Sequence, residues 1–288
     1  ADTTKPIPTV MVVNFTDGSA SLSASETLDV TPASNMDTSK FVLRGTSTPS
    51  VPVSLDDSTV MDVDGTTIMF TLSEQERVDA LKLTSHPGGN NTPILRIADN
   101  ALRDNAINFN VDIDAVQFNS SADILRPSLD NVSVNYNDGL ITLTGSETLL
   151  AELTNLNNLF IRSESYNADL AGSIIYGDTG VANAPLRVKM TEFQRSQVIA
   201  HSGTNGGDTT AIVMDANSGG IFDIGHNPNF PISGLTFTEI ADTTLPILTG
   251  NGIINYSTGL IIFAFNETID ATPDTEIQLN KIQLVDTN

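Results

Sequence analysis

The chain has 288 residues, with 35 Asp or Glu against 13 Lys or Arg, so its formal net charge at pH 7 is −22. So acidic a chain is not expected to bind nucleic acid or anionic membrane surfaces, because both need basic patches. Cysteine is absent, which excludes a disulfide framework and a thiol nucleophile. No run of 18 apolar residues occurs, so no membrane insertion is expected.

One short pattern occurs three times along the chain. It reads NFTDG, NYNDG and NYSTG, and its copies begin at Asn14, Asn135 and Asn255, which are 121 and 120 positions apart. A repeat of this length is large enough to form a domain with its own core. The sequence therefore predicts two complete units and the first part of a third, at 1–121, 122–240 and 241–288.

Each unit is expected to open with a β-hairpin. In the first unit, the segment that follows Gly18 alternates apolar and small polar residues, which is the pattern of a half-buried strand. The Asp17-Gly18 pair is a strong signal for a tight hairpin turn, and the strand before it is expected at 9–15. The corresponding first strands of the other units are expected at 131–136 and 252–256.

The second half of each complete unit contains one helical segment. The segment 73–83 begins with Ser73 and carries Glu76 three residues later, which is a capping-box pattern. The segment 191–201 of the second unit looks similar. A short helix between strands predicts an all-β unit, a sandwich of seven or eight antiparallel strands with Greek-key connections.

Six short segments carry a resemblance to a known family: DTTKP (2–6), SETLD (25–29), DGTTIMFTLS (64–73), IADNALRDN (97–105), DIGHNP (223–228) and DTTLP (242–246). Together they resemble the bacterial Ig-like repeats of large extracellular adhesins and of microbial surface fibres. The resemblance covers nearly the whole chain, although the second unit has ADILRP where the first has ADTTKP. It implies tandem Ig-like antiparallel β-sandwiches, with one short helix per full repeat, at the cell surface or outside the cell.

A glutamate closes the first hairpin of each unit, at Glu26, Glu147 and Glu267, and strand parity points it toward the core side. A carboxylate in that place needs a partner. One option is capping by backbone amides in a loop, and the other is Ca²⁺, which prefers oxygen ligands. The aspartates that could share the ion are Asp2, Asp123 and Asp242 at the unit boundaries and Asp99, Asp104, Asp215 and Asp223 in the late loops. No other cofactor is expected.

Six asparagines lie in N-x-S/T sequons and are candidate glycosylation sites, with N-linked glycans expected if the source is eukaryotic. Two of them, Asn14 and Asn255, belong to the repeated turn, so the sequon is interpreted as optional decoration on a required Asn-aromatic turn. The full set is Asn14, Asn90, Asn119, Asn131, Asn255 and Asn266.

No catalytic pattern stands out in the sequence. The histidines at 86, 201 and 226 are isolated, and no metalloprotease, nucleophile-elbow or phosphate-loop motif occurs. The protein is therefore not expected to be an enzyme.

The third unit raises the question of what covers its apolar side chains. Three occupants are open: a continuation of the chain, the second unit, or another copy that adds strands across a head-to-tail interface. The last is the favoured hypothesis, and it predicts a structural subunit of an extracellular filament or surface appendage that is its own partner. The alternative is a cell-surface adhesin or glycan-binding module. The self-assembly residues are expected to be Ile261, Phe263, Phe265, Ile282 and Leu284.

Overall fold

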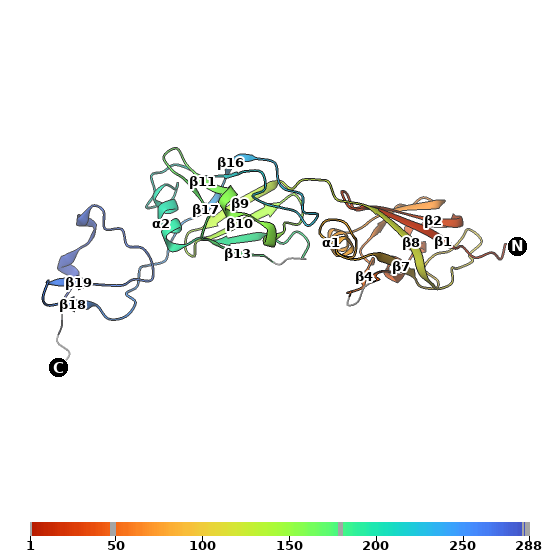
Figure 1. The fold of residues 1–288 in the computed structure, drawn as a ribbon, viewed down its shortest axis with the longest axis horizontal. Coiled ribbons are helices and arrows are strands. Elements are labelled where there is room, and N and C mark those ends of the chain that lie inside the picture. The colour runs from red at the N-terminus through yellow and green to blue at the C-terminus, as the bar shows by residue number, and fades with distance from the viewer. Residues whose placement is uncertain (1, 47–49, 178–180, 284, 286–288) are drawn as a thin grey trace.

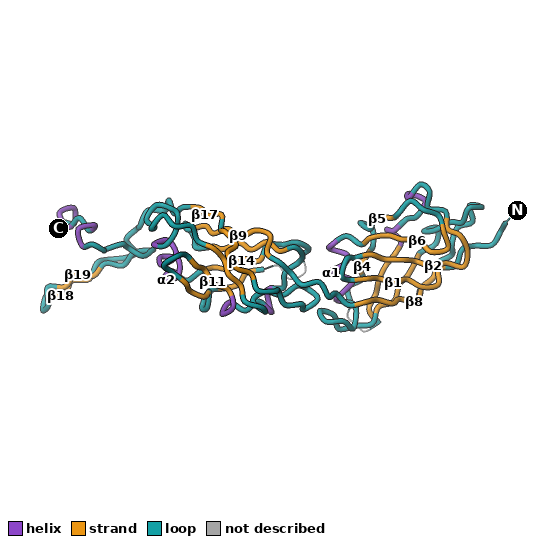
Figure 2. The backbone as a smooth tube through the Cα atoms, turned by 90° about the horizontal axis from the view of Figure 1, so that it is seen from above, coloured by secondary structure: helices purple, strands orange, loops and turns teal. Residues whose placement is uncertain are grey.

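The computed structural model describes residues 2–46, 50–177, 181–283 and 285. Three units follow one another along the long axis of the molecule (Figure 1). A view turned by 90° shows the same order, with the N-terminus and unit 3 at opposite ends (Figure 2). The last strands of units 1 and 2, β8 (Ile113–Ser121) and β17 (Thr238–Ile240), end where the repeat places the unit boundaries.

The described residues of unit 1 form eight strands and one α-helix. The helix α1 (Glu74–Lys82) has the predicted capping box, because Ser73 accepts a hydrogen bond from the Glu76 backbone and the Glu76 carboxylate accepts one from the Ser73 backbone. The other elements are β1 (Pro8–Asn14), β2 (Ser19–Leu28), β3 (Phe41–Gly45), β4 (Val53–Ser54), β5 (Thr59–Val60), β6 (Gly65–Thr71), β7 (Pro93–Ile97) and the 3-10 turns η1 (Ala33–Asn35) and η2 (Thr38–Lys40).

Unit 2 repeats this order up to its last two strands, which together take the place of β8. Its helix α2 (Glu192–Ala200) also has a capping box, formed by Thr191 and Gln194. The other elements are β9 (Leu129–Asn135), β10 (Leu140–Gly145), β11 (Leu159–Arg162), β12 (Asn167–Asp169), β13 (Ile174–Tyr176), β14 (Leu186–Lys189), β15 (Val213–Ala216), β16 (Ile232–Thr236) and the 3-10 turns η3 (Ala151–Leu153) and η4 (Leu156–Asn158).

The strand order is that of an immunoglobulin-like sandwich. In unit 1 one sheet runs β5-β6-β2-β1 and the other runs β4-β3-β7-β8, and β8 joins them. Leu95 of β7 pairs with Val116 of β8 in antiparallel fashion, whereas Met11 of β1 pairs with Phe118 of β8 in parallel. Unit 2 has the same two sheets, with β17 parallel to β9. The predicted all-β sandwich is therefore confirmed, with one parallel strand pair in each unit where only antiparallel pairs were expected.

The repeated turn delivers one aromatic side chain to the core of each complete unit. Phe15 in unit 1 and Tyr136 in unit 2 are both fully buried. Val78 and Leu81 of α1 are also fully buried in the core of unit 1. Fully burying a side chain of this size contributes roughly 1.5–3 kcal/mol, so the turn and the helix are each fastened to the core.

Unit 3 begins in the same way. It has the hairpin strands β18 (Ile253–Asn255) and β19 (Leu260–Ile262), followed by the 3-10 turns η5 (Asp274–Glu276) and η6 (Leu279–Lys281). No strand is assigned to the described residues near 282, and Leu284, a predicted self-assembly residue, lies outside the described residues. Tyr256, at the position of Phe15 and Tyr136, is 90% exposed.

Candidate functional site

The junction between units 1 and 2 centres on one buried arginine of α1. Arg77 stands one helical turn after Glu74, and its Nε donates to Glu74 Oε2 at 2.7 Å. Its Nη1 donates to Phe15 O at 2.8 Å and to Asp123 Oδ2 at 2.9 Å. Its Nη2 lies 3.4 Å from Glu147 Oε2. The Arg77 side chain is only 6% exposed, so a single guanidinium ties the helix and the repeated turn of unit 1 to two carboxylates of unit 2.

Glu74 forms the second tie across this junction, which we call junction 1. Its Oε1 accepts a hydrogen bond from Thr148 Oγ1 at 2.7 Å. Burial alone would raise the pKa of Glu74, but hydrogen bonds from Arg77 and Thr148 outweigh it and hold the pKa below its usual value. Glu74 is therefore ionised at neutral pH and completes the charge pairing of Arg77.

Junction 2, between units 2 and 3, is built from the corresponding residues. Arg195 Nε donates to Glu192 Oε2 at 2.8 Å, and its Nη1 donates to Tyr136 O and to Asp242 Oδ2, both at 2.6 Å. Its Nη2 donates to Glu267 Oε2 at 3.1 Å. The network is more open than in junction 1, since the Glu192 side chain is 45% exposed. Equivalent arginines, Arg77 and Arg195, therefore hold two successive junctions.

The residue that differs between copies of the repeated turn has the same role in both junctions. In junction 1, Thr16 Oγ1 donates to Ala122 O and accepts from Ile124 N, both at 3.3 Å. In junction 2, Asn137 Nδ2 donates to Ala241 O at 3.1 Å and Asn137 Oδ1 accepts from Thr243 N at 2.8 Å. Threonine and asparagine each supply one donor and one acceptor to the start of the next unit. The third position of the turn therefore serves the junction whether or not it completes a sequon.

The glycine that ends the repeated turn leaves room for the arginine. Gly139 has φ +69°, and a Cβ there would lie 3.1 Å from Arg195 Cδ. The replacement Gly139→Ala is expected to cost about 1–2 kcal/mol in backbone strain. Displacing Arg195 from its rotamer is expected to add about 0.5–1.5 kcal/mol. Differential scanning calorimetry of the unit 2 transition measures the sum.

Gly172→Ala in the same unit is the matched control for this substitution. Gly172 has φ +83°, but a Cβ there would make only an ordinary contact, 3.9 Å from Thr191. The control should lose stability through backbone strain alone, without the contribution from displacing Arg195. Equal losses of stability in the two variants would show that the glycine does not make room for Arg195.

Carboxylates gather around the first residues of each complete unit. Acidic group 1 consists of Asp2, Glu26 and Asp104, and acidic group 2 of Asp123, Glu147 and Asp223, with one oxygen from each residue lying within 4.8 Å of the others. All three residues of group 2 are buried, whereas Asp2 of group 1 is exposed. Asp242 and Glu267 of unit 3 occupy the first two of these positions.

The structure brings together six of the ten predicted metal-site residues in these two groups. Asp99 and Asp215 lie outside both, so their predicted grouping was wrong. Asp99 is exposed and accepts a hydrogen bond from Asn100, and Asp215 on β15 is paired with Arg162 at 2.7 Å. Residue type alone does not distinguish among the four late-loop aspartates, and of these only Asp104 and Asp223 belong to an acidic group.

The predicted glycosylation sites differ in accessibility. Asn14 is half-buried, and its Oδ1 accepts hydrogen bonds from Thr16 N at 3.1 Å and from Ser121 Oγ at 3.0 Å. Asn135 and Asn255 accept a backbone hydrogen bond two residues on in the same way, so the asparagine of the turn has a structural role. The other five sequon asparagines, which are exposed, are Asn90, Asn119, Asn131, Asn255 and Asn266.

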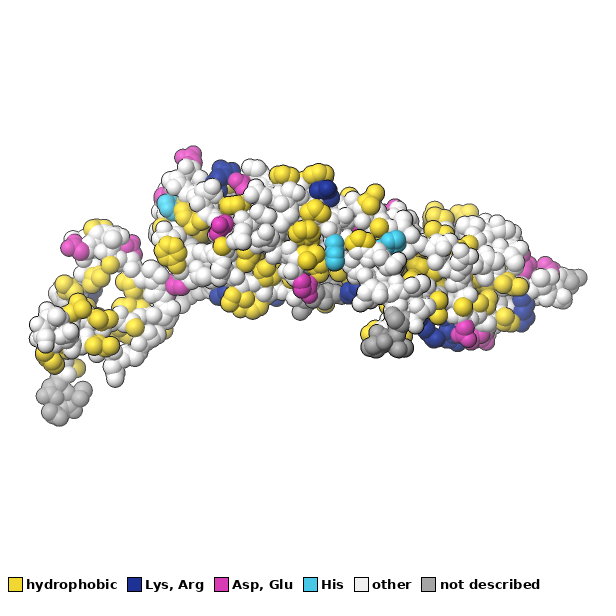
Figure 3. Space-filling view, in the orientation of Figure 1, with side chains coloured by type: hydrophobic (Ala, Val, Ile, Leu, Met, Phe, Trp, Pro, Cys, Tyr) yellow, Lys and Arg dark blue, Asp and Glu magenta, His cyan; other side chains and the backbone are white. Residues whose placement is uncertain are grey.

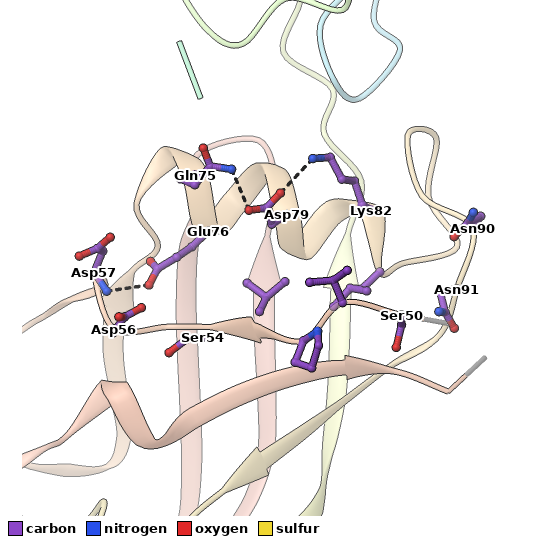
Figure 4. Close-up of a pocket in the computed structure, with 14 residues that line it drawn as sticks. Ser50, Ser54, Asp56, Asp57, Gln75, Glu76, Asp79, Lys82, Asn90 and Asn91 are labelled. Carbon is purple, nitrogen blue, oxygen red and sulfur yellow. Dashed lines mark hydrogen bonds and ion pairs between the residues drawn. The ribbon is translucent and has the colours of Figure 1, made fainter. Parts of the chain in front are cut away.

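A polar groove runs between α1 and β4 in unit 1 (Figure 4). Its side chains are tied to one another: Glu76 accepts a hydrogen bond from Asp57 N at 2.8 Å, and Asp79 accepts from Gln75 at 2.7 Å and from Lys82 at 2.9 Å. The first contact fastens α1 to the loop after β4, and the other two lie within the helix. The lining residues that the structure describes include no histidine or cysteine.

A serine, a histidine and an aspartate do meet in unit 2. Ser165 Oγ lies 3.1 Å from His201 Nδ1 and Asp208 Oδ2 lies 3.5 Å from the same nitrogen. In a catalytic triad the serine and the carboxylate face opposite ring nitrogens, so that one nitrogen accepts the serine proton while the carboxylate holds the tautomer through the other. Here both face Nδ1, and the arrangement differs from a triad.

Comparisons with known proteins add little to this picture. No family model matches the chain, and no curated protein matches it. Among solved structures, a chain described as tandem Ig repeats of Dlar is 10% identical and covers 82% of this chain and 97% of its own length, with a TM-score of 0.16. Within the described residues, no helix is both long and apolar enough to span a membrane. The Ig-like assignment therefore rests on the strand order of units 1 and 2.

Proposed function

We propose that this chain is a structural subunit of an extracellular filament or surface appendage, in which Ig-like units are held end to end as a stiff rod. The observation that carries the proposal is the repeated junction. At each joint an equivalent arginine, Arg77 or Arg195, is paired with a glutamate of its own helix. It also binds an aspartate and a glutamate of the next unit. The proposal also includes a relationship to bacterial Ig-like adhesin and fibre repeats, a location at the cell surface and glycosylation.

The junction contacts favour a fixed angle between units 1 and 2. Domains joined by a simple linker move relative to one another by default. Here Ala122 of the linker accepts a hydrogen bond from Thr16. Side chains of α1 form hydrogen bonds with Asp123, Glu147 and Thr148. Two apolar side chains of unit 2, Leu150 and Ile224, also pack into the core of unit 1. Polar and apolar contacts on three sides of the linker oppose bending.

Self-association through unit 3 is the second part of the proposal. Its hairpin side chains are exposed, at 64% for Ile253 and 40% for Ile261, and apolar atoms gather over this unit in Figure 3. Phe265 and Ile282 are 38% and 43% exposed, and Phe263 is half-buried. Strand addition from a second copy would cover these side chains. Because unit 3 and the N-terminus lie at opposite ends of the molecule, such a contact could repeat into a filament.

Sedimentation velocity and electron microscopy of the purified chain test the self-association. The wild-type chain is expected to form larger species as its concentration rises, and Ile261→Asp is expected to abolish them. Ile174→Asp is the matched control, since Ile174 is also exposed, at 56%, but lies on β13 of the middle unit. A wild-type chain that stays monomeric at every concentration would contradict assembly through unit 3.

A further inference from the structure

Acidic group 2 contains more negative charge than its protein partners neutralise. Asp123, Glu147 and Asp223 are 4%, 7% and 0% exposed. Arg77 is paired with Asp123, Glu147 and Glu74, and Asp223 adds a fourth carboxylate beside the first two. Burying carboxylates beside one another is costly unless another positive charge compensates them.

Two oxygens in this group have no protein partner among the described residues. They are Glu147 Oε1 and Asp223 Oδ2. The other oxygen of each carboxylate is engaged, since Glu147 Oε2 faces Arg77 and Asp223 Oδ1 accepts a hydrogen bond from Asn227 N at 2.8 Å. The protein therefore orients both carboxylates and leaves one oxygen of each buried without a donor, which normally carries a large penalty.

The spacing of the three carboxylates suits a calcium ion. Ca²⁺ binds oxygens at 2.3–2.6 Å, so ligands on opposite sides of one ion are about 4.8 Å apart. The nearest oxygens of Asp123, Glu147 and Asp223 all lie within 4.8 Å of one another. We infer that acidic group 2 is a Ca²⁺ site of unit 2, ligated by Asp123, Glu147 and Asp223, whose ion and Arg77 share the carboxylates of junction 1.

The electrostatics of the group agree with a cation there. Burial, together with repulsion from Asp223 and Asp123, raises the pKa of Glu147 to about 8. Burial also raises the pKa of Asp223 to about 6, although hydrogen bonds from Asn227 act in the opposite direction. Both shifts express an excess of negative charge that a divalent cation would relieve. This inference does not depend on self-association or on the proposed filament.

Acidic group 1 offers an internal comparison. Glu26 Oε1 also lacks a partner among the described residues, but Asp2 is exposed and both oxygens of Asp104 accept hydrogen bonds, from Ala106, Asn108 N and Asn108 Nδ2. Its carboxylates are better solvated and better satisfied than those of group 2. Group 1 is therefore expected to bind Ca²⁺ more weakly than group 2.

Isothermal titration of the EDTA-treated full chain with CaCl₂, and separately with MgCl₂, is the test. The wild-type chain is expected to bind Ca²⁺ with a Kd of about 10⁻⁴ M or lower, and Mg²⁺ more weakly, because the larger ion accepts irregular oxygen sites. Near 100 times the Kd, Ca²⁺ should raise the melting temperature of unit 2 by about 5–10 °C. Glu147→Gln and Asp223→Asn should weaken the tightest site at least tenfold, while the matched control Asp99→Asn should leave it unchanged.

The melting temperatures of the same variants distinguish a loss of Ca²⁺ binding from a loss of folding. In EDTA each removes one charge from a crowded buried group, so each should melt at or above the wild-type temperature, and only in Ca²⁺ should the wild-type chain become the more stable. A wild-type chain with no calorimetric or thermal response to millimolar Ca²⁺ would overturn the inference. Variants that keep the wild-type response would overturn it as well, because Ca²⁺ would then bind elsewhere.

Discussion

Replacing Arg77 with methionine is expected to lower the free energy of unfolding of the unit 1–unit 2 pair by about 3–5 kcal/mol. Methionine keeps much of the apolar stem of the side chain but removes all its donors. Asp123 and Glu147, whose side chains are 0% and 7% exposed, would then be buried without their positive partner. The carbonyl of Phe15 would also lose the hydrogen bond from Arg77. Removing one partner of a buried ionic network costs far more than the network contributes as a whole.

Urea unfolding followed by circular dichroism, with calorimetry to separate the units, measures this effect. Arg96→Met is the matched control, because Arg96 also pairs with two aspartates, Asp112 and Asp114, but on the surface of β7. Exposed ion pairs contribute about 0–1 kcal/mol, so the control should change stability by that amount or less. Similar losses in the two variants would contradict the assignment of Arg77 as the centre of the junction.

Replacing Asn229 with alanine is expected to destabilise unit 2 by about 3 kcal/mol or more. Asn229 is fully buried, and its amide is saturated. Its Oδ1 accepts from Gly220 N and Ile221 N, both at 3.0 Å, and its Nδ2 donates to Asn217 O at 3.0 Å and to Phe230 O at 2.6 Å. Alanine would remove the amide from all four groups and leave Ile221 N and Phe230 O unpaired, whereas Gly220 N and Asn217 O keep the hydrogen bond between them. Asn110 makes the corresponding four hydrogen bonds in unit 1, so Asn110→Ala should have a similar effect there.

Calorimetry of Asn229→Ala should show a lower melting temperature for unit 2 alone, and Asn110→Ala a lower one for unit 1 alone. Asn119→Ala is the control, since Asn119 is exposed on β8 and surface substitutions usually change stability by less than about 0.5 kcal/mol. Losses in the range of the Asn119 control would show that water replaces the amide in these loops at little cost.

The features that the sequence predicted correctly are those that depend on neighbouring residues. The capping boxes at Ser73 and Thr191 and the turns at Gly18 and Gly139 are decided within about five positions, and all of them are present in the structure. The 120-residue repeat then placed these local elements in the same order in both units. Val78 of the helix and Tyr136 of the repeated turn are buried because one face of each element must leave water.

The junctions were not predicted because their contacts join residues far apart in the sequence. Arg77 meets Asp123 and Glu147 at separations of 46 and 70 positions, respectively. Nothing local distinguishes Arg77 from a solvated helix residue, so it was missing from the predicted site. One signal was present: both helices carry glutamate and arginine three positions apart, Glu74 with Arg77 and Glu192 with Arg195. A second signal was present: Asp104 and Asp223 occupy equivalent positions in the two units, whereas Asp99 and Asp215 do not. Only the fold, however, shows which aspartates join the acidic groups.

The most direct test of the central claim, that Arg77 and its carboxylates hold units 1 and 2 at a fixed angle, is the distance distribution between spin labels on the two units. Because the chain has no cysteine, the double variant M69C/R187C would carry labels only at two exposed strand positions, one in each unit. Pulsed electron resonance of this variant should give one narrow distance peak, and adding Arg77→Met should broaden it. A broad distribution that Arg77→Met leaves unchanged would contradict the rigid junction.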